Sequence, residues 1–308
     1  MVTDVRGRLS RARRRLMRRP GAYIVGMHRS GTSAVARIVN LLGVPIGDAE
    51  DLIEADPPSN PKGHWESGSL AAFNDRLLAT LGGAWSAPPQ MPPQWEAYDY
   101  IGALGGEAIR AFDAVYGSKA WVWKDPRLCL TIPFWRRQLK VRSVALLVLR
   151  HPLEVAASLE ARNGFPTAYS LALWERYNRQ ALLGLRGLPV LVTAFESLLQ
   201  DAPGWCRQTA AFLKAAGLPA SVPPSGALGE FLDPKLRHSA QGLETLESPA
   251  VSAEQRALHK ALIGAAGSHA SFHLSLSIDE TASTARLIAA HREAVVAARN
   301  PWLVPERR

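Results

Sequence analysis

The segment Gly26-Met-His-Arg-Ser-Gly-Thr-Ser33 constrains the fold most, because it joins a short apolar stretch to an amphipathic one through a glycine-flanked turn. Gly26 and Gly31 allow the backbone to curl without Cβ clashes, so that successive N–H groups from about His28 to Ser33 point into one concavity. That concavity lies at the positive end of the following helix. The segment therefore predicts a strand, an anion-binding loop and a helix, in that order.

This loop departs from a nucleoside-triphosphate loop at one position. The spacing of Gly26, Gly31 and Ser33 fits a P-loop, but Thr32 stands where a Walker A loop has Lys. Because that Lys reaches the β- and γ-phosphates, we expect the bound anion not to be the tail of ATP or GTP. The alternative interpretation is an ordinary strand-turn-helix junction.

A second candidate phosphate element follows the apolar run 143–149, which predicts a fully buried strand. Arg150 stands at the carboxyl end of this strand, where open parallel sheets bind ligands. Its guanidinium can bind a phosphate through two hydrogen bonds, and Ser158, two helical turns further on, adds a hydroxyl. For either residue alone, an ion-paired Arg or a Ser on a solvated helix face would be the simpler interpretation.

The hydrophobic periodicity predicts strands alternating with helices. Strands are expected near 23–27, 120–124, 143–149 and 189–194, and helices near 32–42, 67–81, 101–115, 152–162, 167–186, 203–216, 252–266 and 278–299. This order predicts an α/β fold, a P-loop-like three-layer sandwich with a central parallel sheet flanked by helices. We expect a basic N-terminal extension over 1–20 and a single domain with C-terminal helices over 21–308.

The composition excludes several classes of protein. A chain of 308 residues that is 47% hydrophobic can bury a full core. It has no apolar run of about 18 residues and no signal-peptide h-region, so we expect a cytoplasmic protein. The two cysteines, Cys129 and Cys206, have no metal-ligand spacing. We predict no metal site.

Much of the net charge of +9 lies before the first strand, in a run of eight arginines. They are Arg6, Arg8, Arg11, Arg13, Arg14, Arg15, Arg18 and Arg19. Such a run favours peripheral contact with an anionic membrane surface, and a solvated extension is the alternative. No aromatic residues alternate with these arginines, so a dedicated nucleic-acid module is not expected.

The two phosphate elements together resemble those of sulfotransferases that use 3′-phosphoadenosine-5′-phosphosulfate (PAPS), in particular bacterial-type enzymes acting on carbohydrates or small molecules. The resemblance covers about residues 22–217. It implies that the loop residues His28, Arg29, Ser30, Gly31, Thr32 and Ser33 bind the 5′-phosphosulfate, and that Arg150 and Ser158 bind the 3′-phosphate. Phe195 falls on the adenine-stacking Tyr of the family. Arg237 belongs to a segment that would close over the nucleotide in place of the family's C-terminal Arg-Lys-Gly loop.

The proton acceptor is the point at which this chain departs from the cytosolic members of that family. In those enzymes a Lys-Thr-His sequence at a strand end supplies a His base, and here Pro126 takes the position of that His, two residues after Lys124. In carbohydrate-directed members a Glu acts instead, and Glu66 occupies the comparable place. Asp125 and His64 are the alternatives, because a carboxylate or imidazole within hydrogen-bond reach can accept the proton. Lys124 would supply positive charge near the transferred group.

These observations predict an enzyme that moves a sulfuryl group from PAPS to a hydroxyl of a glycan, glycolipid or small molecule without a metal. A P-loop kinase or related phosphotransferase is one alternative, and Thr32 disfavours it. A non-catalytic nucleotide-binding protein of the same fold is another. An α/β-hydrolase is disfavoured because Ser30 does not lie in a Gly-x-Ser-x-Gly turn.

Overall fold

The computed structural model describes residues 19–56, 63–276 with a gap at 223–245, and 279–299. Arg237 and all of the basic extension except Arg19 and Pro20 lie outside the described residues. Arg19 is buried and donates a hydrogen bond from Nη2 to Oδ1 of Asp113 at 2.8 Å. This arginine of the predicted extension therefore contacts the folded part of the chain.

A five-stranded sheet forms the centre of the molecule. Its strands are β1 (Gly21–Val25), β2 (Trp121–Lys124), β3 (Ser143–Leu149), β4 (Val190–Ala194) and β5 (Gly267–His269). Their order is β2-β1-β3-β4-β5, and the first four are parallel whereas β5 pairs antiparallel with β4. The predicted α/β class with a parallel sheet is confirmed. The pattern did not indicate β5, which has three residues and lacks a long apolar run.

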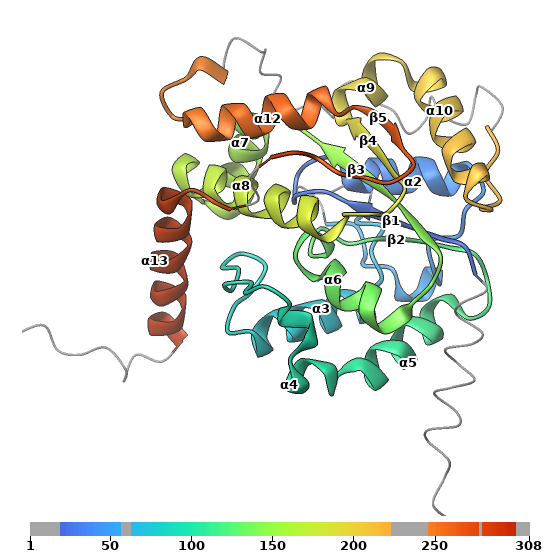
Figure 1. The fold of residues 1–308 in the computed structure, drawn as a ribbon, viewed down its shortest axis with the longest axis horizontal. Coiled ribbons are helices and arrows are strands. Elements are labelled where there is room, and N and C mark those ends of the chain that lie inside the picture. Colours follow the sequence, from blue (N-terminus) through green and yellow to red (C-terminus); the bar gives the residue numbers. More distant parts are fainter. Residues whose placement is uncertain (1–18, 57–62, 223–245, 277–278, 300–308) are drawn as a thin grey trace, which may run out of the picture.

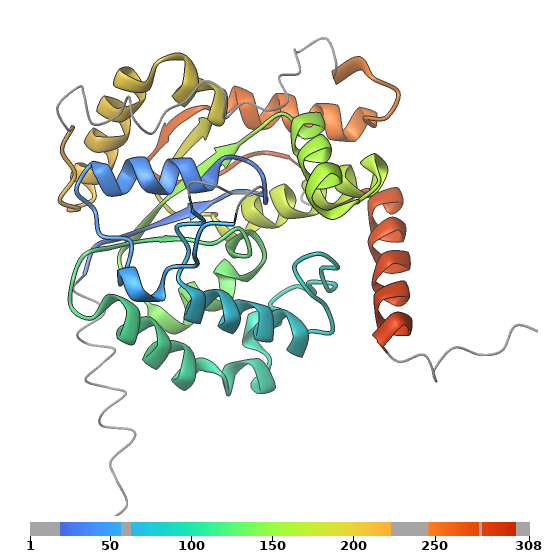
Figure 2. The same ribbon diagram turned by 180° about the vertical axis from the view of Figure 1, so that it is seen from behind.

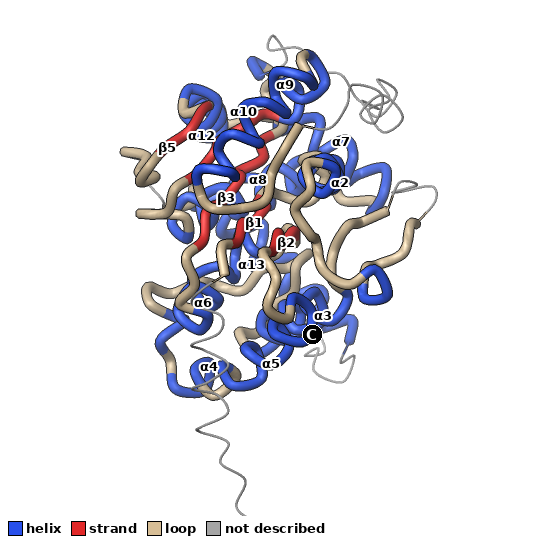
Figure 3. Tube along the Cα trace, turned by 90° about the vertical axis from the view of Figure 1, so that its right-hand side faces the viewer, coloured by secondary structure: helices blue, strands red, loops and turns tan. Residues whose placement is uncertain are grey.

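Alternate residues of the central strands face two separate hydrophobic cores. In β1, Tyr23 and Val25 belong to one core, whereas Ala22 and Ile24 belong to the other. This is the period of two that a strand imposes on its side chains. Both faces are apolar because helices cover both. Figure 3 shows the strands lying between helices on either side.

Helices flank the sheet on both faces. One face carries α2 (Thr32–Leu41), α9 (Phe195–Gln200) and α10 (Ala202–Ala215), and the other carries α3 (Gly68–Thr80), α4 (Asp99–Gly102), α5 (Gly105–Tyr116), α6 (Leu128–Leu139) and α8 (Thr167–Gly184). The remaining helices are α7 (Pro152–Asn163), α12 (Ala253–Gly264) and α13 (Ala282–Arg299), with short 3-10 turns at Ala49–Asp51 and Trp95–Ala97. Figure 1 shows α3 to α6 gathered on one side, and Figure 2 shows α2 lying across the strands on the other.

Helix α6 was not indicated by the sequence because Pro133 lies within it. A proline normally disrupts a helix interior, since it lacks an N–H group and crowds the preceding turn. Here the helix is buried over most of its length, and Leu128, Ile132 and Trp135 are among its core residues. Tertiary packing therefore outweighs the local cost of the proline.

The carboxyl ends of the four parallel strands bring the candidate site residues to one edge of the sheet. The phosphate loop follows β1, Lys124 ends β2, Arg150 follows β3 and Phe195 follows β4. Ligands of open α/β sheets bind at this edge. Among the described helices, none combines the length and the hydropathy needed to span a bilayer.

Candidate functional site

The phosphate loop is held close to its surroundings by two glycines. A Cβ on Gly26 would lie 2.6 Å from the carbonyl oxygen of Val148 in the neighbouring strand, which excludes a side chain there. Gly31 has φ +83, and a Cβ on it would lie 2.3 Å from the ring of Phe195. Arg29 also adopts a positive φ of 70, a conformation that L-residues rarely adopt and that concentrates at functional sites. The backbone therefore forms the curled turn predicted from the glycine spacing.

The two candidate phosphate elements contact each other directly. Arg29 Nε donates to Ser158 Oγ at 2.7 Å, and Arg150 Nη1 donates to the backbone oxygen of Arg29 at 2.9 Å. Arg150 Nε is paired with Oε2 of Glu154 at 2.8 Å, and its guanidinium lies 5.5 Å from the ring centroid of Phe195. Residues 129 positions apart in the chain thus form one surface.

A buried ion pair joins the end of β2 to the segment that precedes α3. Lys124 Nζ donates to Glu66 Oε1 at 2.5 Å and to Ser33 Oγ at 3.1 Å. The second oxygen of Glu66 lies 3.4 Å from Nη1 of Arg127. The preceding residue, Trp65, has φ +56, and Ser67 caps α3 by accepting a hydrogen bond from the Leu70 N–H. These local constraints place Glu66 beside the loop.

Burial shifts the pKa values of this pair in opposite directions. Loss of solvent raises the pKa of Glu66, and the positive charge of Lys124 opposes that shift. Desolvation likewise lowers the pKa of Lys124, and the Glu66 carboxylate opposes that shift. A carboxylate with a raised pKa binds a proton more readily than an exposed one, which suits a proton acceptor.

Asp125 and His64, the two alternative bases, lie in different environments. Asp125 is 1% exposed, and it accepts hydrogen bonds from Asn74 at 2.8 Å and from the backbone and side chain of Arg127 at 2.8 and 3.0 Å. His64 is half-buried in the pocket wall, where desolvation, with Lys124 nearby, lowers its pKa to about 4. Asp125 therefore orients Arg127 and is not among the residues that line the pocket.

A cavity of about 310 Å³ brings most of the candidate residues together. It is lined by His28, Arg29, Gly31, Thr32, Ser33, Ala34, Ile53, His64, Glu66, Trp85, Lys124, Pro126, Arg127, Arg150, Arg162 and Phe195. Ser30 is buried within the loop, and Ser158 stands behind Arg29 as its hydrogen-bond partner. The roles expected for these residues remain predictions, but their common location is now established.

Arg162 and Trp85 line this cavity although sequence reasoning did not single them out. Arg162 lies four residues after Ser158 on α7, so the two share a helix face. That spacing was a usable signal. Trp85 precedes the proline-rich segment at Ser86, where no periodicity marks one side chain over another, and no signal in the sequence identified it.

Basic side chains dominate the electrostatics of the cavity. Burial, together with the neighbouring charges of Arg162 and Arg150, lowers the pKa of Arg29 to about 10. Burial also lowers the pKa of His28 well below its ordinary value, with Arg127 and Lys124 adding to the shift. Burial is the larger cause of both shifts, and the neighbouring positive charges that add to them are ones that a bound polyanion would neutralise.

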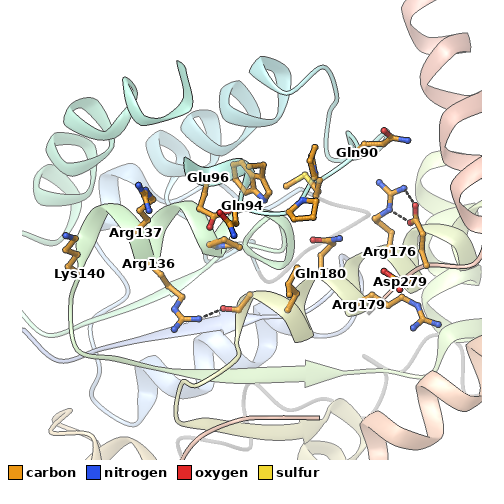
Figure 4. A pocket seen from close by; sticks show the side chains of 18 residues that line it. Gln90, Gln94, Glu96, Arg136, Arg137, Lys140, Arg176, Arg179, Gln180 and Asp279 are labelled. Atoms are coloured by element: carbon orange, nitrogen blue, oxygen red, sulfur yellow. Dashed lines mark hydrogen bonds and ion pairs between the residues drawn. The ribbon is translucent and has the colours of Figure 1, made fainter. Parts of the chain in front are cut away.

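A second cavity, of about 1020 Å³, lies between α6, α8, the segment 90–96 and the residues before α13 (Figure 4). Its described lining includes Arg136, Arg137 and Lys140 at one end and the Arg176–Glu280 ion pair at the other. Among the described residues, none of the phosphate loop and none at the carboxyl ends of the strands lines it. The smaller cavity is therefore the candidate reaction site despite its size.

Comparison with known proteins does not show a family for this chain. No family model and no curated protein matches the sequence. Among solved structures, the chain is similar to the sulfotransferase domain of the Synechococcus PCC 7002 olefin synthase, at 17% identity over 88% of this chain and 94% of that chain, with a TM-score of 0.41. It is also similar to the sulfotransferase domain from the curacin biosynthetic pathway, at 14% identity over 88% and 97%, with a TM-score of 0.37. Function is therefore inferred from the residues of the site.

Proposed function

We propose that this protein is a PAPS-dependent sulfotransferase that transfers a sulfuryl group to an alcohol. The observation that carries the proposal is the single cavity shared by the phosphate loop, by Arg150 beside Phe195, and by the Lys124–Glu66 pair. An anion-binding loop, a second anion-binding arginine and a proton acceptor are the three parts that the reaction requires.

The residues present fit the donor. The cavity is lined by five basic residues, Arg29, Lys124, Arg127, Arg150 and Arg162. Glu66 is the one carboxylate among its described lining residues. PAPS carries about four negative charges, so this excess of basic groups matches it. The N–H groups of the loop and the hydroxyls of Thr32 and Ser33 would hold the 5′-phosphosulfate at the N-terminus of α2. Arg150 and Ser158 would hold the 3′-phosphate, and Phe195 would contact the adenine.

Glu66 is the proposed proton acceptor. When PAPS is bound, the acceptor oxygen forms a bond to sulfur, the bond from sulfur to the phosphate oxygen breaks, and the acceptor proton passes to Glu66. Glu66 suits this role because it lines the cavity and has a raised pKa, whereas Asp125 is not among the residues that line the cavity. Lys124, which contacts both Glu66 and Ser33, is placed to stabilise negative charge on the leaving phosphate.

The direct test is transfer of labelled sulfate from PAPS to a panel of alcohols in the presence of excess EDTA. We expect product to form at an undiminished rate, because Lys124 and the surrounding arginines supply the positive charge that Mg²⁺ supplies to nucleoside triphosphates. The control replaces PAPS with ATP and Mg²⁺. Phosphoryl transfer in the control, with strict Mg²⁺ dependence and no sulfuryl transfer, would contradict the proposal and favour the kinase alternative.

The pH dependence of kcat/KM should be bell-shaped and narrower than the ordinary pKa values of Glu and Lys would give. Glu66 must be ionised to accept a proton, and its pKa is raised from 4.5, so activity should fall with acidification at a pH above 4.5. Lys124 must be charged, and its pKa is lowered from 10.5, so the alkaline limb should lie below 10.5. The measurement is a pH–rate profile with the Glu66→Asp variant as comparison. An acidic limb at or below pH 4.5 would count against Glu66 as the base.

A further inference from the structure

Trp85 lines the reaction cavity, and the proposed donor-binding groups do not include it. It is half-buried and contacts His28 with ring centroids 4.5 Å apart and ring planes tilted by 40°. Phe165 lies 6.2 Å from the indole, centroid to centroid, with its ring plane tilted by 44°. These two tilted ring contacts restrict the indole, and its remaining surface lines the cavity.

The backbone that carries Trp85 is tied to α8 by successive carbonyl groups. Tyr177 Oη donates to the Trp85 oxygen at 2.7 Å, and Tyr169 donates to the oxygen of Ser86. Further along, Arg176 Nη1 donates to the oxygen of Pro89 at 2.8 Å. Three side chains of one helix therefore hold a proline-rich segment that has no regular structure of its own. This support pre-organises the indole for binding.

The basic side chains of the cavity come from the phosphate loop, from Arg150 and α7, and from the end of β2. Arg162 shares a helix face with Ser158, which is the hydrogen-bond partner of Arg29, so this arginine belongs with the phosphate-binding groups. The lining residues from outside the phosphate elements include Ile53, His64 and Trp85, all of them uncharged at neutral pH. The carboxylate in this part of the cavity is Glu66, and it repels an anion.

We infer that Trp85 is the platform of an acceptor subsite for neutral, ring-bearing alcohols, such as sugars or aromatic alcohols, which stack on its indole. This inference rests on the proposed function. An aromatic ring on the indole adds stacking to the area that it buries, and a sugar buries the apolar C–H face of its ring there. An anionic acceptor would meet Glu66 after the donor has neutralised the basic groups, so neutral rings are favoured over their carboxylate counterparts.

The test uses the protein loaded with adenosine 3′,5′-bisphosphate, and measures ligand binding by saturation-transfer NMR. The probes are two matched pairs, methyl β-D-glucoside with methyl β-D-glucuronide, and benzyl alcohol with 4-(hydroxymethyl)benzoate. We expect at least one neutral member to bind about tenfold more tightly than its carboxylate partner. Which pair responds distinguishes a sugar from an aromatic acceptor. Carboxylates that bind as tightly as the neutral rings would overturn the inference.

Variants at the platform give an independent readout. Trp85→Leu should weaken binding of the preferred neutral ring about tenfold, whereas Trp85→Phe should keep it within about threefold, because a ring is retained. The control is Tyr100→Leu, which removes an aromatic side chain that is 53% exposed and does not line this cavity. Equal binding by Trp85→Leu and the unaltered protein would refute the platform.

Failure of the inference can be told apart from failure of the proposed function. Binding of adenosine 3′,5′-bisphosphate is measured for every variant before the ring ligands are added, together with the melting temperature. If the bisphosphate does not bind to the unaltered protein, the sulfotransferase proposal fails. If the bisphosphate binds and the neutral rings bind equally to the unaltered protein and to Trp85→Leu, only the acceptor subsite is refuted.

Discussion

Glu66→Gln should lower turnover with PAPS by roughly 10²-fold or more while changing donor affinity by less than about threefold. Gln keeps the size of the side chain and can still accept a hydrogen bond from Lys124, but it cannot take the acceptor proton at neutral pH. Single-turnover rates, measured at saturating acceptor and donor, test the chemical step. Titration with adenosine 3′,5′-bisphosphate tests the donor site.

The control for stability follows from the burial of the pair. Removing one partner of a buried ion pair leaves the other charge uncompensated and destabilises the fold. Melting temperatures of Glu66→Gln and of the double variant Glu66→Gln with Lys124→Met therefore show how much of any loss is unfolding. If folded Glu66→Gln turns over a true acceptor at a near-normal rate, Glu66 is not the base.

Asp125→Asn separates the two carboxylates. Asp125 accepts hydrogen bonds from Asn74 and from Arg127, and Arg127 in turn is paired with Asp75 at 2.6 Å. We expect this variant to lower the melting temperature and weaken donor binding by displacing Arg127, while the acidic limb of the pH–rate profile stays in place. Loss of that limb in Asp125→Asn, with its retention in Glu66→Gln, would assign the base to Asp125.

The parallel part of the sheet and its ligand-binding edge could be predicted from sequence because each of the four parallel strands has a local signature. The run 143–149 is apolar at every position except Ser143, and it is buried at every position, so its strand could be recognised without any partner. The phosphate loop was recognisable for the same reason. Gly26 permits the close backbone contact and Gly31 the positive φ that the loop requires. Arg150 could be assigned to the ligand-binding edge because it comes directly after this strand.

Contacts between distant segments could not be predicted from these local patterns. Glu66 and Lys124 are separated by 58 residues, and their pairing depends on how α3 packs against the sheet. The segment after Trp85 contains prolines, and its path is set by side chains of α8 rather than by its own sequence. Hydrophobic periodicity predicts which face of a helix or strand is buried. It does not predict which loop the side chains of another helix will bind.

Arg150→Ala should abolish any preference for a 3′-phosphate. We expect the unaltered protein to bind adenosine 3′,5′-bisphosphate at least tenfold more tightly than adenosine 5′-monophosphate, a difference of about 1.4 kcal/mol. Two of the five N–H donors of Arg150 are used by Glu154 and by the backbone of Arg29, and within the described residues the other three remain for a ligand. Calorimetric titration of both nucleotides against both proteins measures the ratio.

The same substitution also removes an ion-pair partner from Glu154, which is fully buried. Combining Arg150→Ala with Glu154→Gln removes both charges of the pair, and so distinguishes lost recognition from lost stability. Ser158→Ala should give a smaller decrease in the ratio, because it removes one hydroxyl and leaves the guanidinium. A folded double variant that still prefers the bisphosphate tenfold would show that the 3′-phosphate is bound elsewhere, and Arg162, one helical turn beyond Ser158, would be the next residue to test.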